Sequence, residues 1–272
     1  MTHLSIPVRR LAWGTDWHMN FLKPAARQAF IERIAGIEAD AFAITGDISD
    51  GSNLEQDLRR IGNTITKPVF VLLGNHDRYH SSFAATEEIV QRATAMHPYL
   101  RRLTGGELVE LSPTTALLGV DGWADGTAGA GSASEVELND SRFIRDLAVL
   151  PRPVRWLKMR ELADEFASAV AATLNEAMAR YQNVIVLTHV PPLPEATWHE
   201  GKPSDAEFLP HFCNPTLGRL LREGCIKFPN TKLTVFCGHT HGEGVHREGN
   251  MTVFTGGAEY FEPRVDRVIE IA

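Results

Sequence analysis

The 272-residue chain is poor in cysteine and has no long apolar run, and each shortage argues against a class of protein. Its three cysteines, Cys213, Cys225 and Cys237, are an odd and sparse set, which argues against a disulfide framework. Cys237 ends the apolar run LTVFC, so we expect a small buried hydrophobic residue there and no catalytic or metal-binding thiol. No run approaches the ~18 apolar residues that a membrane-spanning helix needs. A disulfide-rich secreted domain and a membrane protein are therefore both disfavoured.

Signals for targeting and for nucleotide-binding phosphate loops are missing as well. The N-terminal sequence MTHLSIPVRRLAWGTD lacks the charged, apolar and small-residue layout of a signal peptide, so we expect a cytoplasmic protein. The glycine-rich segment GTAGAGS lacks the Gly-Lys-Ser/Thr ending of a phosphate-binding loop, and we interpret residues 121–141 as a mobile surface loop. The net charge of −7 gives the chain no overall attraction to nucleic acid or anionic membranes.

Short apolar runs alternate with helical patterns along the chain. Hydrophobic residues make up 43% and charged residues 22% of the sequence, which is ordinary for a protein with a large core. Strands are expected at residues 11–15, 41–45, 69–73, 107–111, 116–120, 184–188, 233–237, 251–255 and 265–271. Helices are expected at residues 24–39, 54–65, 82–96 and 154–181. This alternation predicts an α/β fold in one domain spanning residues 1–272, with an irregular insertion around 121–160 and a long loop around 191–215.

Polar side chains follow five of these strands, at the point where each strand ends. They are Asp16 and His18, Asp47, Asn75 and His76, His189, and His239 and His241. In open α/β sheets, ligands bind outside the carboxyl ends of the strands. We therefore expect the five groups to converge on one site.

The residue types in these groups suit two neighbouring divalent metal ions. Two ions need a bridging carboxylate, neutral imidazoles and further oxygen ligands. Asp16 and His18, like His239 and His241, stand at positions i and i+2, which face the same side of an extended chain. Because the set offers oxygen and imidazole ligands without a thiolate, it suits Mn, Fe, Zn or Co.

The order of these motifs resembles that of the calcineurin-like metallophosphoesterase superfamily. Asp-x-His, Gly-Asp-x-x-Asp, Gly-Asn-His-Asp, a lone His and Gly-His-x-His follow one another from Asp16 to His241. The resemblance implies a four-layer αββα sandwich, in which two mixed sheets pack face to face between outer helices. It implies one metal ion held by Asp16, His18, Asp47 and His241. It implies a second ion held by Asp47, Asn75, His189 and His239, with Asp47 bridging the two.

The resemblance also implies a mechanism, in which a hydroxide bridging the two metal ions attacks phosphorus. His76 would protonate or stabilise the leaving oxygen, and Asp50, three residues after Asp47, would orient that histidine. We expect His76 to be catalytic and not a metal ligand, because neighbouring side chains of an extended segment point to opposite faces. Asn75 is the ligand by the family match.

Two departures from related branches narrow the expected function. Protein Ser/Thr phosphatases carry Asp-Arg-Gly where this chain has Asp50-Gly51, so a phosphate-binding arginine is missing. His76 stands where the lipid-A-pathway pyrophosphohydrolases have an arginine. The chain thus resembles the cyclic-nucleotide and general phosphodiesterase branch, and we expect a phosphodiesterase or phosphomonoesterase acting on a phosphorylated small molecule. A metal-dependent nuclease and a catalytically silent scaffold are the alternatives.

Other polar residues admit both a structural and a functional interpretation. Asp77 is expected to be a structural hydrogen-bond partner. His199 and His211 are interpreted as ordinary loop histidines in preference to substrate contacts. A basic cluster between residues 142 and 160 is interpreted as a solvated helix face in preference to a grip on additional substrate phosphates. It is also the one basic groove that a nuclease could use.

Overall fold

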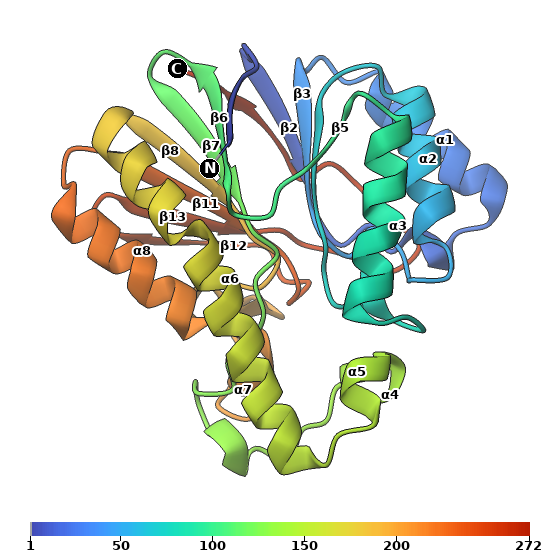
Figure 1. Cartoon of the computed structure of the whole chain (residues 1–272), viewed down its shortest axis with the longest axis vertical. Helices are drawn as coiled ribbons and strands as arrows, with labels where there is room; N and C mark the ends of the chain where they lie inside the picture. Colours follow the sequence, from blue (N-terminus) through green and yellow to red (C-terminus); the bar gives the residue numbers. More distant parts are fainter. Residues whose placement is uncertain (1) are drawn as a thin grey trace.

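The computed structural model describes residues 2–272 and contains two β-sheets packed face to face (Figure 1). The five-stranded sheet has the strand order β14-β2-β3-β4-β5. Its strands are β2 (Arg10–Gly14), β3 (Ala41–Thr45), β4 (Val69–Leu72), β5 (Leu100–Arg102) and β14 (Arg267–Glu270). All neighbours in this sheet are parallel except β14, which is antiparallel to β2.

The second sheet has seven strands in the order β1-β6-β7-β8-β11-β13-β12. They are β1 (Thr2–Ser5), β6 (Glu107–Ser112), β7 (Thr115–Gly119), β8 (Asn183–Leu187), β11 (Lys232–Cys237), β12 (Gly244–Glu248) and β13 (Met251–Thr255). The β6–β7 and β12–β13 pairs are antiparallel and the others are parallel. A separate short hairpin is formed by β9 (Trp198–His199) and β10 (Lys202–Pro203).

Long helices cover the outer face of each sheet (Figure 1). The five-stranded sheet is covered by α1 (Pro24–Ala35), α2 (Leu54–Thr64) and α3 (Phe83–Met96). The seven-stranded sheet is covered by α6 (Arg152–Arg180) and α8 (Pro215–Lys227). The remaining helices are short: α4 (Asp140–Phe143), α5 (Arg145–Ala148), α7 (Leu209–Phe212), η1 (Met19–Phe21), η2 (His76–Arg78), η3 (Gly131–Ala133) and η4 (Pro194–Ala196).

The central strands are apolar on both faces because each face packs against another layer. In β3, Ala41 and Ala43 belong to the core between the sheets, whereas Phe42 and Ile44 belong to the core beneath the helices. Trp13 and Phe236, from different sheets, meet with their ring centroids 4.7 Å apart. Burial on both faces accounts for continuous apolar runs in these strands. The predicted four-layer αββα sandwich is confirmed.

The strands β1, β5 and β12 were not expected, and two further parts of the fold also differ from the expectation. Helix α8 was not predicted, because Gly218 and Gly224 weaken its helical pattern. These glycines allow close packing, since a Cβ atom at Gly224 would lie 2.8 Å from Sδ of Met178. The sequence did contain a start signal, because Asn214 accepts a hydrogen bond from the Leu217 N–H and precedes a proline.

The interpretation of residues 121–141 as a mobile surface loop is wrong for its first half. Asp121, Trp123 and Asp125 are buried. Both carboxylate oxygens of Asp121 accept hydrogen bonds from Arg102, at 2.6 and 2.7 Å. A carboxylate buried in this way needs such a partner, and the pairing holds the start of the segment inside the protein. In the part of the chain from residue 2 onward, no helix is long and apolar enough to cross a membrane.

Candidate metal centre

The predicted ligands converge at the carboxyl ends of the strands of both sheets. Asp16, Asp47 and Asn75 follow β2, β3 and β4 of the five-stranded sheet. His189 and His239 follow β8 and β11 of the seven-stranded sheet. The site therefore lies where the edges of the two sheets meet, as the position of the polar groups predicted.

The backbone at these positions is left-handed and not extended. Asp16, His18, Asp47, His239 and His241 have φ angles of 49°, 42°, 51°, 74° and 60°. Residues other than glycine rarely adopt positive φ angles. The backbone strain that these angles impose is concentrated at functional sites. Asp16 and His18 therefore do not share a side of an extended chain, and neither do His239 and His241. Left-handed turns position these side chains, and His239 and His241 belong to different groups of ligands.

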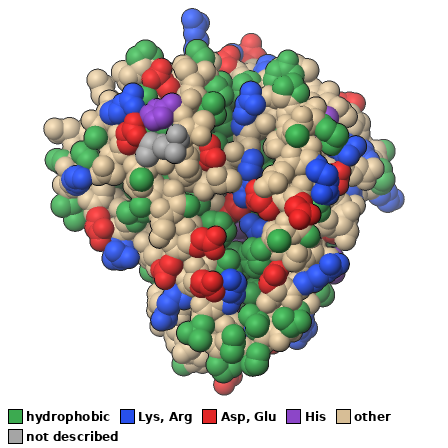
Figure 2. Space-filling view, in the orientation of Figure 1, with side chains coloured by type: hydrophobic (Ala, Val, Ile, Leu, Met, Phe, Trp, Pro, Cys, Tyr) green, Lys and Arg blue, Asp and Glu red, His purple; other side chains and the backbone are tan. Residues whose placement is uncertain are grey.

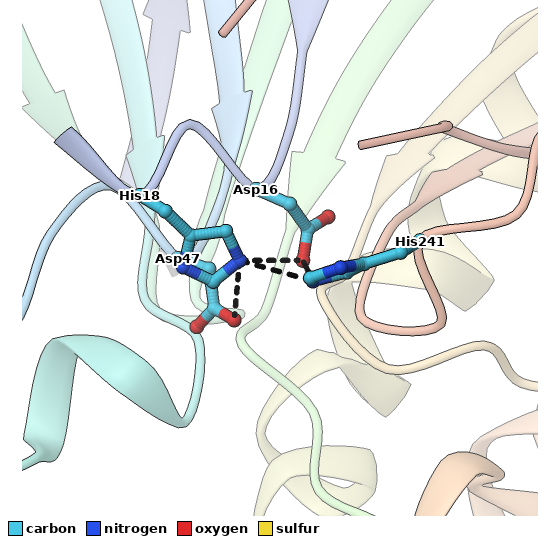
Figure 3. Close-up of side chains that lie close together, drawn as sticks. All are labelled: Asp16, His18, Asp47 and His241. Carbon is cyan, nitrogen blue, oxygen red and sulfur yellow. Dashed lines mark hydrogen bonds and ion pairs between the residues drawn. The ribbon is translucent and has the colours of Figure 1, made fainter. Parts of the chain in front are cut away.

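Four side chains form a compact group that we call the first cluster. They are Asp16, His18, Asp47 and His241 (Figure 3). One ligand atom from each lies within 4.8 Å of all the others, and Figure 3 shows the side chains pointing toward a common point. Nε2 of His18 lies 3.0 Å from Nε2 of His241. Ring nitrogens at this distance fit an N–H···N hydrogen bond between the two rings, and when both are unprotonated they fit a shared cation.

The other predicted ligands form the second cluster with Asp47. Oδ1 of Asn75 lies 3.2 Å from Nε2 of His189 and 3.0 Å from Nδ1 of His239. Nε2 of His189 lies 3.5 Å from Oδ1 of Asp47. The same atoms that could coordinate a metal ion therefore face one another.

Asp47 lies between the two clusters and turns one oxygen toward each. Its Oδ2 lies 3.7 Å from Nε2 of His18, and its Oδ1 faces His189 in the second cluster. The Oδ1 atom also accepts the backbone N–H of His76 at 2.8 Å. Gly74 permits this arrangement, because a Cβ atom there would overlap the Asp47 carboxylate and lie 2.6 Å from Nε2 of His189.

The ionisation of the site fits two cations. Burial lowers the pKa of His18 to about 3 and that of His189 to about 4, so both rings are neutral at pH 7. Neutral imidazole is the form that binds metal. Burial, followed by the charges of Asp16 and Asp77, raises the pKa of Asp47 well above its usual value. A divalent ion would offset the repulsion between the Asp16 and Asp47 carboxylates that contributes to this raised pKa. The residues present therefore fit a binuclear centre.

Several groups that orient the second cluster were missed by the sequence reasoning. Nδ1 of His189 bonds to the Thr45 carbonyl at 2.8 Å, and Nε2 of His239 bonds to the His211 carbonyl at 2.9 Å. Nδ2 of Asn75 donates to Oδ1 of Asp140 at 2.8 Å. No sequence signal pointed to these acceptors, because any residue supplies a carbonyl and Asp140 lies in an irregular segment.

Asp140 belongs to the predicted insertion, which contacts the loop after β4 through hydrogen bonds. Its Oδ1 also accepts the Tyr79 hydroxyl at 2.7 Å, and the Tyr79 ring stacks on His76 with centroids 4.2 Å apart. The backbone N–H of His80 donates to the Phe143 carbonyl at 2.8 Å. The insertion therefore supports both Asn75 and His76.

The predicted catalytic pair is not in hydrogen-bond contact. Oδ1 of Asp50 accepts the N–H groups of Ser52 and Asn53, each at 3.0 Å. Among residues 2–272, no hydrogen bond joins Asp50 to His76. His76 begins the turn η2 and does not lie on an extended segment, so the reason given for opposing Asn75 and His76 does not hold, and both residues line the cleft described below. Asp77 is structural, as predicted, and accepts the N–H groups of Ser49 and Gly74, each at 2.9 Å.

A cleft of about 240 Å³ opens over both clusters. Its walls include His76, Leu138, His199, Phe212 and Tyr260. Within the described part of the chain, no lysine or arginine lines it. His199, interpreted as an ordinary loop histidine, is thus part of the cleft wall, where its Nδ1 bonds to the Thr240 carbonyl at 3.0 Å.

Comparison with known proteins places the chain in a family and relates its fold to solved structures. The family model described as calcineurin-like phosphoesterase matches residues 10–243. No curated protein matches the sequence. Among solved structures, a phosphopantetheinyl hydrolase from Mycobacterium tuberculosis is 12% identical, with a TM-score of 0.64 over 93% of this chain and 91% of that chain. A dimetal phosphatase from Danio rerio is 14% identical, with a TM-score of 0.54 over 93% and 88%. At these identities the likeness establishes the fold.

Proposed function

From the premise that this chain belongs to the calcineurin-like phosphoesterase family and is a metal-dependent phosphoesterase, we propose that it hydrolyses phosphate diesters of small molecules. The observation that carries the proposal is a cluster of candidate metal ligands beneath a cleft without lysine or arginine in its described walls. A dianionic monoester needs more positive charge around it than a monoanionic diester. The cleft therefore suits the diester better.

The first cluster would hold one divalent ion and the second cluster the other, with Asp47 as the bridging ligand. Oxygen and imidazole donors suit Mn, Fe, Zn or Co. Two such ions would lower the pKa of bound water and offset the negative charge that develops on the phosphate oxygens. The closeness of donor atoms in both clusters supports this assignment.

His76 would stabilise the leaving oxygen as a hydrogen-bond donor. Its ring lies 4.5 Å from the ring of His18, lines the cleft and rests on Tyr79. Burial and the neighbouring histidines lower the pKa of His76 well below its usual value, so the ring is neutral at pH 7 and carries one N–H. Asp50 would act by holding the loop after Asp47, since its hydrogen bonds stay within residues 50–53.

Arg78, the arginine next to the Gly-Asn-His-Asp motif, adds no positive charge to the cleft. Arg78 follows the Gly-Asn-His-Asp motif, yet it is buried and donates to Oδ2 of Asp121 at 2.7 Å. Its guanidinium also lies over the Phe83 ring, 4.6 Å from the centroid. A guanidinium committed to a buried carboxylate does not reach a substrate phosphate. This supports a preference for the less charged ester.

The nuclease alternative is not supported by the basic cluster. Arg152 donates to the Ser134 carbonyl, Arg155 pairs with Glu137, and Lys158 pairs with Glu161. On the face in Figure 2, lysine and arginine side chains are scattered among acidic ones. A nucleic-acid groove needs uncompensated positive charge along its length.

An activity panel tests the proposed function. The metal-free protein is loaded with Mn, Fe, Zn or Co and given bis(p-nitrophenyl) phosphate, p-nitrophenyl phosphate, a cyclic nucleotide and an oligonucleotide. We expect the aryl diester to be hydrolysed at least as well as the aryl monoester with at least one metal. A strong monoester preference across all four metals, or cleavage of the oligonucleotide alone, would contradict the proposal.

A further inference from the structure

The wall of the cleft beside the first cluster is aromatic. The ring centroid of Tyr260 lies 4.9 Å from that of His18 and 5.2 Å from that of His241. Phe21 lies behind it, with a centroid distance of 4.7 Å. A phosphate bound at the first cluster would therefore bring its organic group within reach of Tyr260.

The rings of Tyr260 and Phe21 are exposed, whereas most large apolar side chains of the protein are buried. Tyr260 is 42% and Phe21 41% exposed, so much of each ring faces solvent. Large exposed aromatic surfaces beside a cleft mark binding sites, because stacking recovers the apolar area that folding leaves open.

Both rings are attached directly to the loops that carry the candidate ligands. The N–H of Phe21 donates to the His18 carbonyl at 3.0 Å, and the N–H of Ala258 donates to the His241 carbonyl at 3.0 Å. The aromatic pair is thus held in a defined position relative to the first cluster. Such prior positioning lowers the entropy lost when a ligand binds.

The cleft beside Tyr260 offers no cation to a further phosphate group. Its described walls contain no lysine or arginine. The charged residues near Tyr260, Glu259 and Glu262, line a neighbouring hollow together with Arg33 and Arg264. An uncharged organic group therefore suits the cleft better than a second phosphate.

We propose that Tyr260, backed by Phe21, is the binding platform for a planar, uncharged aromatic group attached to the phosphate of the substrate. The proposal rests on the proposed function and specifies its substrate class as an ester with such a group. Tyr260 and Phe21 bind this group and take no part in proton transfer. Aromatic stacking of this kind is worth about tenfold or more in affinity.

Binding of two phosphonates tests the platform independently of turnover. Phenylphosphonate and methylphosphonate are titrated calorimetrically into the Mn-loaded protein. We expect phenylphosphonate to bind about tenfold more tightly to the wild type. Tyr260→Leu should abolish most of this preference, and Phe21→Leu should reduce it by a smaller factor. Unchanged methylphosphonate binding by each variant shows that the fold and the metals are intact.

Tyr99→Leu is the matched control. Tyr99 is 39% exposed, but its carbonyl accepts the N–H of Val69 at the start of β4, the end of the strand opposite the site. This variant should keep the full preference, as should Phe212→Leu on the other wall of the cleft. The proposal is overturned if the wild type shows no preference, if Tyr260→Leu retains it, or if Phe212→Leu alone removes it. Turnover of bis(p-nitrophenyl) phosphate is measured separately, and its absence would count against the proposed function instead.

Discussion

The first cluster contains two buried carboxylates, Asp16 and Asp47, whereas the second cluster contains only the carboxylate that they share. Conversely, the side chains of the second cluster are oriented by hydrogen bonds on their far sides, to Asp140 and to two backbone carbonyls. In the first cluster, Nδ1 of His18 is buried without a partner among residues 2–272. The Asp16 carboxylate is itself held by the Thr15 hydroxyl and the His239 N–H, so the two clusters differ in their buried charge and in the support of their imidazole and amide ligands.

The difference shows that two metal sites built from one set of motifs can depend on different parts of the chain. The first cluster draws its donors from loops next to the central strands. The second cluster also depends on the insertion, which contributes Asp140, and on the long loop, which contributes the His211 carbonyl. Substitutions far from the motifs should therefore affect the second cluster more than the first.

Among substitutions that affect only one cluster, removal of a charge from the first cluster should reduce activity the most. In Asp16→Asn, the ion of the first cluster should be lost while the second is retained, because half of the local negative charge is gone. Activity should fall about 10³-fold or more. Elemental analysis and kcat/KM measure both effects. Asp125→Asn is the control, since Asp125 is buried but binds only Thr127 and Thr216. Two tightly bound metals in Asp16→Asn would contradict the charge argument.

His76→Asn should leave both clusters intact and reduce turnover. If His76 assists the leaving oxygen, its loss should slow alkyl esters about 10²–10⁴-fold. Nitrophenyl esters should be slowed less, because nitrophenolate leaves without help. Metal content and the ratio of the two rates are the measurements. Equal slowing of both ester types, or loss of a metal, would show that His76 is a ligand or a phosphate-binding residue.

Asp140→Asn should weaken the second cluster selectively, by about 10–100-fold in metal affinity. The new amide no longer offers a charged acceptor to Asn75 and Tyr79. Metal titration of the metal-free protein separates the two affinities. Asp146→Asn is the matched control in the same insertion, because Asp146 accepts only the Phe83 N–H among its hydrogen bonds in the described chain. If both variants lower metal affinity alike, the effect comes from the fold of the insertion and not from Asn75.

Asp50 should give the smallest effect. Asp50→Asn keeps an oxygen that accepts the same N–H groups, so activity should stay within about twofold of wild type. Asp50→Ala should destabilise the protein by about 1 kcal/mol through the lost hydrogen bonds. Thermal unfolding and the alkyl-to-nitrophenyl rate ratio are measured together. A selective loss on alkyl esters in Asp50→Asn would instead establish the orienting role toward His76 that the sequence suggested.

Much of the fold and the composition of the site could be predicted from the sequence. Central strands such as β3 are recognisable because burial on both faces demands a continuous apolar run. The polar residues after each strand could be assigned to one site because parallel strands end at the same edge. The strand β12 and the helix α8 could not, because β12 has the mixed sequence GVHRE and α8 contains two glycines.

The parts of the site that escaped prediction are those that depend on backbone shape or on distant partners. The left-handed conformation of Asp16 and His18 leaves no trace in residue type, since aspartate and histidine also fit extended chain. Asp140 is 65 positions from Asn75, in a segment without regular pattern. The role of the ligand residues themselves stays a prediction until metal binding is measured.

Metal content tests the central claim most directly, that Asp47 joins two metal ions in one centre. The wild type and Asp47→Ala are loaded with Mn, freed of unbound metal and subjected to elemental analysis. The account predicts two ions per chain in the wild type and disruption of both sites in Asp47→Ala, because both clusters lose the carboxylate that they share. At most one tightly bound ion in the wild type, or two ions retained in Asp47→Ala, would contradict it.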